Sequence, residues 1–237
     1  GTALKEQREL LARQDSPRAE LLRALADWQW VEATGDADAA RRLLESVKKV
    51  RAQKLPVEDE LAVMEFQATW VLEGLWAALK RLEAEHARVG EDDGVEHLPW
   101  LYLARFLLGT WPELTDPPDA LDSSMASAWW AMKGAVALKQ KRVVDAKAAL
   151  AKVQRPPFAG AVRSSPMWAA SEGLRAVLLV ATGSTDEGRA ASEALVRELE
   201  AEPTWPRQVR WARALAGAVE RCTSWTCVGS VVEPAGP

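Results

Sequence analysis

Two histidines and two cysteines are the residues of this chain most suited to metal binding or covalent chemistry. His86 and His97 lie eleven positions apart with the acidic stretch "EDDG" between them, so nitrogen and oxygen ligands could in principle meet at one metal ion. This spacing matches neither a helical H-x-x-x-H pair nor a zinc motif. No glycine-rich phosphate loop, G-x-S-x-G turn or neighbouring cysteine and histidine occurs. We therefore expect no metal, no cofactor and no enzymatic activity.

Cys222 and Cys227 are the only cysteines, and they flank Trp225 near the end of the chain. They form no C-x-x-C motif and have no histidine nearby, which leaves a disulfide or two unrelated thiols. A regular helix would hold the two Cα atoms about 8.6 Å apart, so a bridge requires the last helix to end near Arg221. The intervening small and β-branched residues suit such an end, and we expect the bridge.

An oxidised pair is typical of proteins outside the bacterial or eukaryotic cytosol. The expected location is therefore the periplasm or cell envelope. The chain begins at Gly1 without a methionine, so a signal peptide or a lipid-anchor cysteine would precede Gly1.

Charge and hydropathy narrow the classes of partner. The chain carries 30 basic and 34 acidic residues and a formal net charge of −4, which leaves no electrostatic footprint for nucleic acid or an anionic membrane. No apolar run approaches the roughly 20 residues of a transmembrane helix. Tryptophan is unusually frequent, with 12 copies against one tyrosine and three phenylalanines, and large flat side chains suit both helix packing and binding surfaces.

Apolar residues recur at helical spacing along most of the chain, and no stretch alternates long enough to predict a strand. The pattern predicts an all-α fold of antiparallel helix pairs, with a helical array over residues 1–221 and a disulfide-stapled tail over residues 222–237. The expected helices are 4–13, 17–33, 37–53, 58–89, 99–108, 118–141, 143–153, 167–182, 186–202 and 206–221. Two longer interruptions, 89–99 and 109–119, are rich in Gly, Pro and Asp, and we expect them to project from one face and carry function.

The stretch "SAWWAMKGAVALKQKRVVDAKAALAKVQRPP" resembles a unit of the tetratricopeptide-repeat family. Trp130 and Gly134 match the large and small positions of that family's first helix. The second-helix positions fall on Ala146, Leu150 and Val153. The resemblance implies a short α-solenoid of stacked helix pairs; the alternative is an irregular helical bundle.

The same resemblance implies a concave surface lined by the first helix of each pair. In the best unit the lining positions are Ala128, Ala131, Ala135 and Leu138, an apolar set that either binds a partner or is filled by neighbouring segments. In the earlier pair they are Leu22, Leu25, Gln29 and Glu32. We expect a scaffold that binds another protein or peptide. The alternative is an apolar pocket for a small or lipidic ligand, walled by Trp129 and neighbouring tryptophans.

Overall fold

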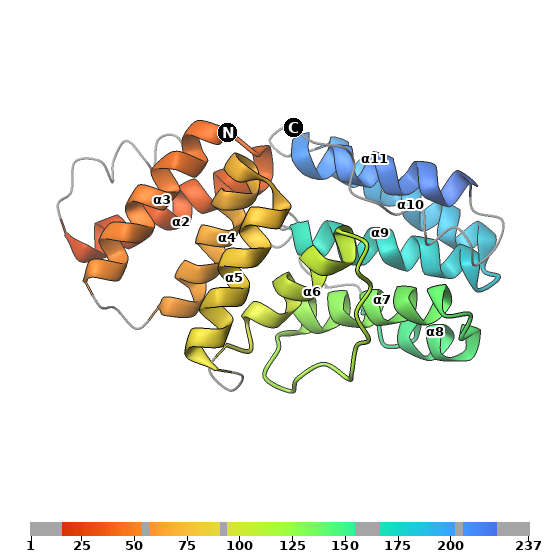
Figure 1. The fold of residues 1–237 in the computed structure, drawn as a ribbon. Helices are drawn as coiled ribbons and strands as arrows, with labels where there is room; N and C mark the ends of the chain where they lie inside the picture. The colour runs from red at the N-terminus through yellow and green to blue at the C-terminus, as the bar shows by residue number, and fades with distance from the viewer. Residues whose placement is uncertain (1–15, 54–56, 91–93, 155–165, 202–205, 222–237) are drawn as a thin grey trace. The chain divides into compact units, whose positions relative to one another are not determined.

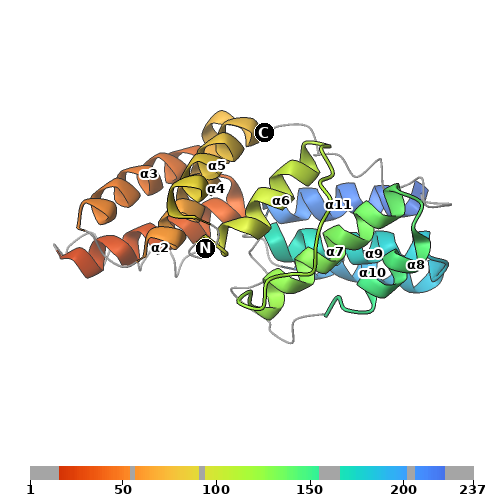
Figure 2. The same ribbon diagram turned by 60° about the horizontal axis from the view of Figure 1, so that its bottom comes forward.

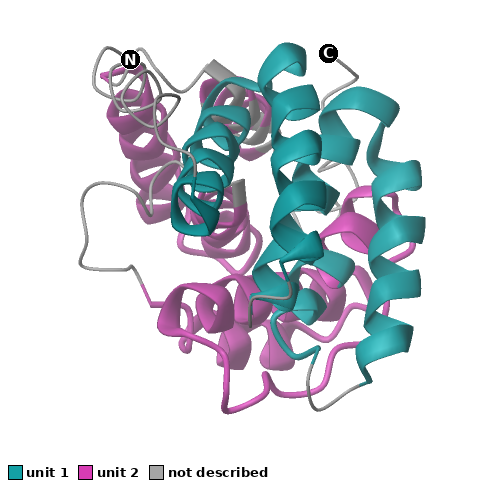
Figure 3. Cartoon of the chain, turned by 90° about the vertical axis from the view of Figure 1, so that its left-hand side faces the viewer, with its two compact units in different colours: residues 1–101, 237 teal, residues 102–236 magenta. Residues whose placement is uncertain are grey.

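The computed structural model describes residues 16–53, 57–90, 94–154, 166–201 and 206–221. Within these residues the chain forms ten helices, α2 to α11, and no strand, so the predicted all-α class is confirmed (Figure 1). The chain divides into two compact units, residues 1–101 and 102–236, coloured separately in Figure 3. The boundary falls inside α6, His97–Leu107. The single array expected over residues 1–221 stays a prediction.

Unit 1 consists of two helix pairs followed by the first residues of α6. In each pair the second helix packs beside the first, and α4 also packs against both helices of the first pair, as in a stack of antiparallel pairs. The four helices are α2 (Pro17–Thr34), α3 (Ala37–Ala52), α4 (Glu58–Glu73) and α5 (Leu75–Val89).

The first pair begins and turns where the sequence predicts. The Ser16 side chain accepts a hydrogen bond from the Ala19 amide, 3.1 Å away, and Pro17 occupies the first helical position. Gly35 then ends α2 in the left-handed region at φ 69°, and the Asp36 side chain caps α3. Because these polar groups satisfy the open ends of two helices, a tight turn between them forms without loss of backbone hydrogen bonding.

The predicted single helix over residues 58–89 is wrong. Gly74 interrupts it at φ 91° and ψ 166°, a backbone conformation that is accessible almost only to glycine. The chain reverses there, and α4 and α5 pack side by side as a pair. A single glycine inside a helical pattern is normally tolerated in the helix, which is why the sequence alone suggests continuity.

Unit 2 continues the same arrangement with two helix pairs and a last helix. The first helices of successive pairs, α7 and α9, pack together, and α11 packs against both members of the second pair (Figure 2). The helices are α7 (Ser123–Lys139), α8 (Val143–Leu150), α9 (Pro166–Ala181), α10 (Thr185–Glu200) and α11 (Pro206–Arg221).

Two helices of unit 2 are shorter than predicted. α7 begins at Ser123 instead of residue 118, because the Asp122 carboxylate accepts hydrogen bonds from the amides of Ser124 and Met125 and so caps the helix there. α8 ends at Leu150, three residues early. The predicted helix over residues 4–13 and the tail over residues 222–237 lie outside the described residues.

Both units have apolar cores built largely from alanine, leucine and valine. In unit 1 a cluster of buried residues joins α2, α3 and α4, and buried Phe66 and Trp70 form an aromatic group with Trp100, whose ring lies 5.9 Å from that of Phe66. In unit 2 Trp168 and Leu199 belong to a cluster between α9, α10 and α11. None of the described helices has the length and hydropathy needed to cross a bilayer.

Candidate functional site

The connection between α6 and α7, residues 108–122, is the longest described segment without helix, and we call it the strap. It leaves α6 through two residues with positive φ, Gly109 at 77° and Trp111 at 44°. Figures 1 and 2 both show it passing across α7 before the chain enters that helix. The prediction that this interruption projects from the fold is therefore wrong: the strap contacts α7 and the residues at the two ends of α8.

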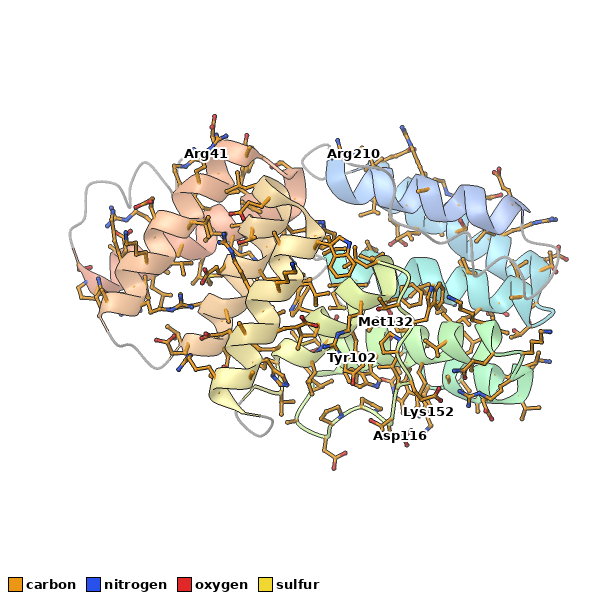
Figure 4. All side chains as sticks on the ribbon, in the orientation of Figure 1. Arg41, Tyr102, Asp116, Met132, Lys152 and Arg210 are labelled. Carbon is orange, nitrogen blue, oxygen red and sulfur yellow. The ribbon has the colours of Figure 1, made fainter. Side chains whose placement is uncertain are left out.

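The middle of the strap is bound to α7 through a backbone carbonyl and a carboxylate. The Trp129 indole Nε1 donates a hydrogen bond to the Thr115 carbonyl oxygen at 3.0 Å. One residue further on, Asp116 accepts a hydrogen bond from Lys133 Nζ at 2.6 Å and lies 4.0 Å from Lys152 Nζ. The hydrogen bond from Lys133 lowers the pKa of Asp116 below its ordinary value, so this carboxylate is charged at neutral pH. Figure 4 shows Asp116 and Lys152 side by side.

A second carboxylate of the strap is bound at the turn between α7 and α8. Gln140 Nε2 and Arg142 Nη2 each donate a hydrogen bond to Glu113, both at 2.7 Å. The hydrogen bond from Gln140, followed by the charge of Arg142, lowers the pKa of Glu113. The side chains of Glu113 and Arg142 are 65% and 42% exposed, so water screens this pair and its contribution to stability is small.

Apolar and cation–π contacts complete the strap's binding face. Leu114 is buried, and the Trp111 ring packs on Phe106 with 4.2 Å between ring centroids. The Lys139 ammonium lies 4.2 Å from the centre of the Trp111 ring. On the neighbouring surface the Trp130 ring lies 3.9 Å from the Lys152 ammonium. The strap is therefore held by one buried aliphatic side chain, by aromatic rings and by several cations.

The structure places the site residues predicted from the sequence mostly inside the protein. Five of them form the buried side of α7 and are at most 2% exposed: Ala128, Trp129, Ala131, Ala135 and Leu138. In α2, Leu22 and Leu25 are half-buried, Gln29 is exposed and Glu32 is buried. Among these nine predicted residues, Trp129 forms a hydrogen bond to the strap through its indole N–H. Cys222 and Cys227 lie outside the described residues.

Sequence reasoning missed the charged residues that bind the strap. In the sequence Lys133 only interrupts an apolar helix, and Arg142 belongs to a basic run typical of a solvated helix end. The signal that could have found them is the pair Glu113 and Asp116, which lie three positions apart. The two prolines that follow Asp116 disfavour a helical conformation there. An acidic pair in an extended segment needs cations nearby or full exposure, and the lysines and arginine of α7 and α8 follow within 40 residues.

Unit 1 carries an open groove of about 520 Å³ over α3, α4 and α5. Its apolar lining is Leu44, Val47 and Ala52, and its charged lining is Glu45, Lys48, Arg51, Glu65 and Arg81. Most of the charges are fixed by ion pairs inside the protein. Arg51 donates to Glu65 at 2.9 Å, and Arg81 donates to both carboxylate oxygens of Glu73, at 2.7 and 2.9 Å. Three ion-paired side chains, Arg51, Glu65 and Arg81, therefore border the apolar floor of the groove.

The two histidines, eleven positions apart in sequence, lie together in unit 1. Their ring centroids are 5.9 Å apart in an edge-to-face arrangement, and His97 is completely buried with its Nε2 atom 3.4 Å from Asp59 Oδ1. Burial lowers the pKa of His97, while the Asp59 charge opposes that change. Among the described residues no three His, Cys, Asp or Glu side chains are placed to hold a metal ion. His86 is half-buried, and the acidic residues 91–93 between the two histidines lie outside the described residues.

No protein-family model, no curated protein and no solved structure matches this chain. The helices and their sequential pairing define the architecture, and any functional assignment has to come from surfaces and side chains, since the same fold class serves many functions. The two surfaces with the most defined chemistry are the groove of unit 1 and the strap-covered face of unit 2.

Proposed function

We propose that this protein is a non-enzymatic helical scaffold of the tetratricopeptide-like kind that binds a segment of another protein. The observation that supports the proposal is the open groove over α3, α4 and α5. A solvent-open groove with an apolar floor and charged edges suits the side of a helix or an extended peptide. Small-molecule sites are typically enclosed and bury most of the ligand surface.

The groove offers specificity through groups that are already fixed in the free protein. Arg51 and Arg81 are held by carboxylates on α4, so a partner meets a charged border whose side chains are already ordered. Lys48 is exposed on the groove edge, and no ion pair is formed by it in the described structure. A partner's carboxylate could therefore pair with Lys48 while its apolar side chains cover Leu44 and Ala52.

The test is site-specific photo-crosslinking in the native host. A photoreactive amino acid at Ala52, which is exposed and lines the groove, should give a discrete adduct with another protein. The same amino acid at Ala190, exposed on α10, is the matched control and should not give that adduct. The charge reversal Lys48→Glu should reduce the adduct at least threefold, whereas Arg189→Glu on α10 should leave it unchanged. Equal adducts at both positions would contradict the proposal.

The compartment belongs to the same proposal and depends on Cys222 and Cys227, which lie outside the described residues. If the two cysteines are joined, the protein belongs to an oxidising compartment such as the periplasm or cell envelope. We expect that alkylation of the unreduced, denatured protein followed by intact-mass measurement adds no label. Two added labels on protein isolated from its host would remove both the disulfide and the argument for that compartment.

A further inference from the structure

Four consecutive residues of the strap, 113–116, contact the rest of unit 2 in the way that a bound peptide would. Glu113 and Asp116 pair with cations, Leu114 is buried, and Thr115 contributes its backbone carbonyl to the Trp129 indole. An apolar anchor, a backbone hydrogen bond and flanking charges are the elements by which proteins recognise extended segments. A connection as long as the whole strap, without helix or strand of its own, is uncommon in compact domains. When such a connection is ordered, it is usually functional.

We propose that the surface beneath the strap, formed by α7 and the residues at the two ends of α8, is a docking site for an extended acidic segment of a partner protein. The segment has the order acidic, leucine or a similar aliphatic residue, any residue, acidic. In the free protein residues 113–116 occupy this site in place of the partner. The proposal rests on the proposed scaffold function for the partner being a protein, but it concerns a different surface from the groove of unit 1.

Charge complementarity identifies the occupant. Lys133, Arg142 and Lys152 surround the positions of the two strap carboxylates, and Lys139 lies over Trp111 next to them. If the strap lifts, Lys133 and Lys152 lose Asp116, and Arg142 loses Glu113 but keeps its ion pair with Asp145. A partner that supplies two carboxylates at the same spacing restores the pairs, and an apolar or basic segment does not.

The strap is held weakly enough to be displaced. The Glu113 and Asp116 side chains are 65% and 70% exposed, so water screens their ion pairs, and Leu114 is the buried side chain among residues 113–116. Segments with few buried apolar contacts open locally at low free energy. The face itself does not depend on the strap for its position, because α7 packs against both α8 and α9.

The experiment uses the full chain with residues 111–118 replaced by glycine and serine at equal length. The probe is a fluorescein-labelled peptide with the sequence of residues 110–120, titrated in fluorescence anisotropy. We expect at least tenfold tighter binding to the strap-replaced protein than to the unchanged protein, in which the strap competes. The same peptide with Leu114→Asp should lose binding at least tenfold, as should the strap-replaced protein carrying Lys133→Glu and Arg142→Glu.

Far-ultraviolet circular dichroism checks that the strap-replaced protein is folded. If it is not, the full-length variant Glu113→Lys, Asp116→Lys replaces it, because this change loosens the strap and keeps Leu114 and Trp111. Absence of saturable peptide binding to either folded variant, or equal binding of a scrambled peptide, would overturn the proposal. Unfolding of both variants would show that the strap is a structural part of unit 2 and would also overturn it. The crosslinking result at Ala52 is independent of all these outcomes.

Discussion

At the scale of single residues, His97 makes the stability of the protein sensitive to acid. Burial lowers the pKa of His97 below its ordinary value of 6.5, whereas the unfolded chain keeps that value. As the pH falls through 6.5 the unfolded state takes up a proton that the folded state does not, so the free energy of unfolding decreases. Above 6.5 both states hold a neutral ring and this contribution is constant. The loss is limited to about 1.4 kcal/mol per pH unit for one proton.

The measurement is urea unfolding at several pH values between 7.5 and 5. We expect His97→Gln to show a shallower decrease of unfolding free energy over this range than the unchanged protein. The groups that face the ring are Asp59 of α4 and His86 and Glu85 of α5, all of which remain in this variant. Identical pH dependence in the two proteins would show that His97 takes up its proton in the folded state as readily as in the unfolded one.

Two glycines in unit 2 mark close helix contacts, and they should respond differently to alanine. A Cβ atom on Gly188 of α10 would lie 2.7 Å from the Ala176 carbonyl oxygen and 2.9 Å from the Val180 amide nitrogen, both backbone atoms of α9. A Cβ on Gly134 of α7 would meet chiefly the end of the flexible Leu178 side chain, at 2.9 Å. Backbone cannot move aside as a side chain can, so overpacking is more costly at Gly188.

We expect Gly188→Ala to lower the free energy of unfolding by about 1 to 3 kcal/mol, despite the gain of about 1 kcal/mol in helix propensity. Gly134→Ala, the matched comparison, should change it by less than about 1 kcal/mol, whereas Gly134→Leu should cost about 1 to 3 kcal/mol. Thermal and urea unfolding give both values. A larger loss for Gly134→Ala than for Gly188→Ala would mean that α9 packs more closely on α7 at Gly134 than on α10 at Gly188.

The sequence indicates the close helix contact at Gly134 but not the one at Gly188. Gly134 stands out because the repeat pattern requires a small residue four positions after Trp130, and the structure confirms its burial. Its closest neighbour, however, is Leu178 of the following pair, not a residue of α8. The sequence predicts the helix that contains Gly188, over residues 186–202, within one residue of its start at Thr185. What the sequence does not indicate is that Gly188 lies against the backbone of α9.

At the scale of helices, Gly74 decides whether residues 58–89 form one helix or two. Its backbone lies at φ 91° and ψ 166°, where any side chain strains the chain even though no atom lies within 4 Å of the position of a Cβ. We expect Gly74→Ala to cost about 1 to 3 kcal/mol of unfolding free energy. Trp76→Ala, at an exposed neighbouring position, should cost less than about 0.5 kcal/mol.

Chemical denaturation of the two variants tests this difference. A neutral effect of Gly74→Ala would mean that the chain can continue as a single helix through this position, as the sequence pattern alone suggests. Unlike the glycines of the α7–α9–α10 contacts, Gly74 acts through its own dihedral angles and not through a neighbouring side chain.

Helix boundaries can be predicted wherever a capping residue is visible in the sequence. Ser16 with Pro17, Gly35 with Asp36, and Pro206 all mark ends that the structure places at the same residues or one residue away. The failures occur where tertiary contacts decide. Nothing local distinguishes Gly74 from a tolerated helical glycine, and the path of the strap depends on cations that follow its carboxylates by 17 to 36 positions. A single sequence contains those residues without indicating that they meet.

At the scale of the whole molecule, the division into two compact units makes distant substitutions independent. Gly74 belongs to unit 1 and Gly188 to unit 2, and the two positions share no partner among the described contacts. We expect the double variant Gly74→Ala, Gly188→Ala to lose the sum of the two single losses within about 0.5 kcal/mol. The double-mutant cycle is measured by urea unfolding. A coupling above about 1 kcal/mol would show that the units stabilise each other strongly.

The sequential pairing of helices also has a consequence for the timing of folding during synthesis. The main helix contacts of α2 to α5 are made among residues 16–101, so these four helices have their principal partners once that part of the chain has left the ribosome. At about 5 to 20 residues per second, the ribosome needs on the order of ten seconds more to deliver the other unit. Helix pairing is complete in microseconds to milliseconds when contacts are local. The helices of the N-terminal half can therefore pair while the strap-bearing half is still being translated.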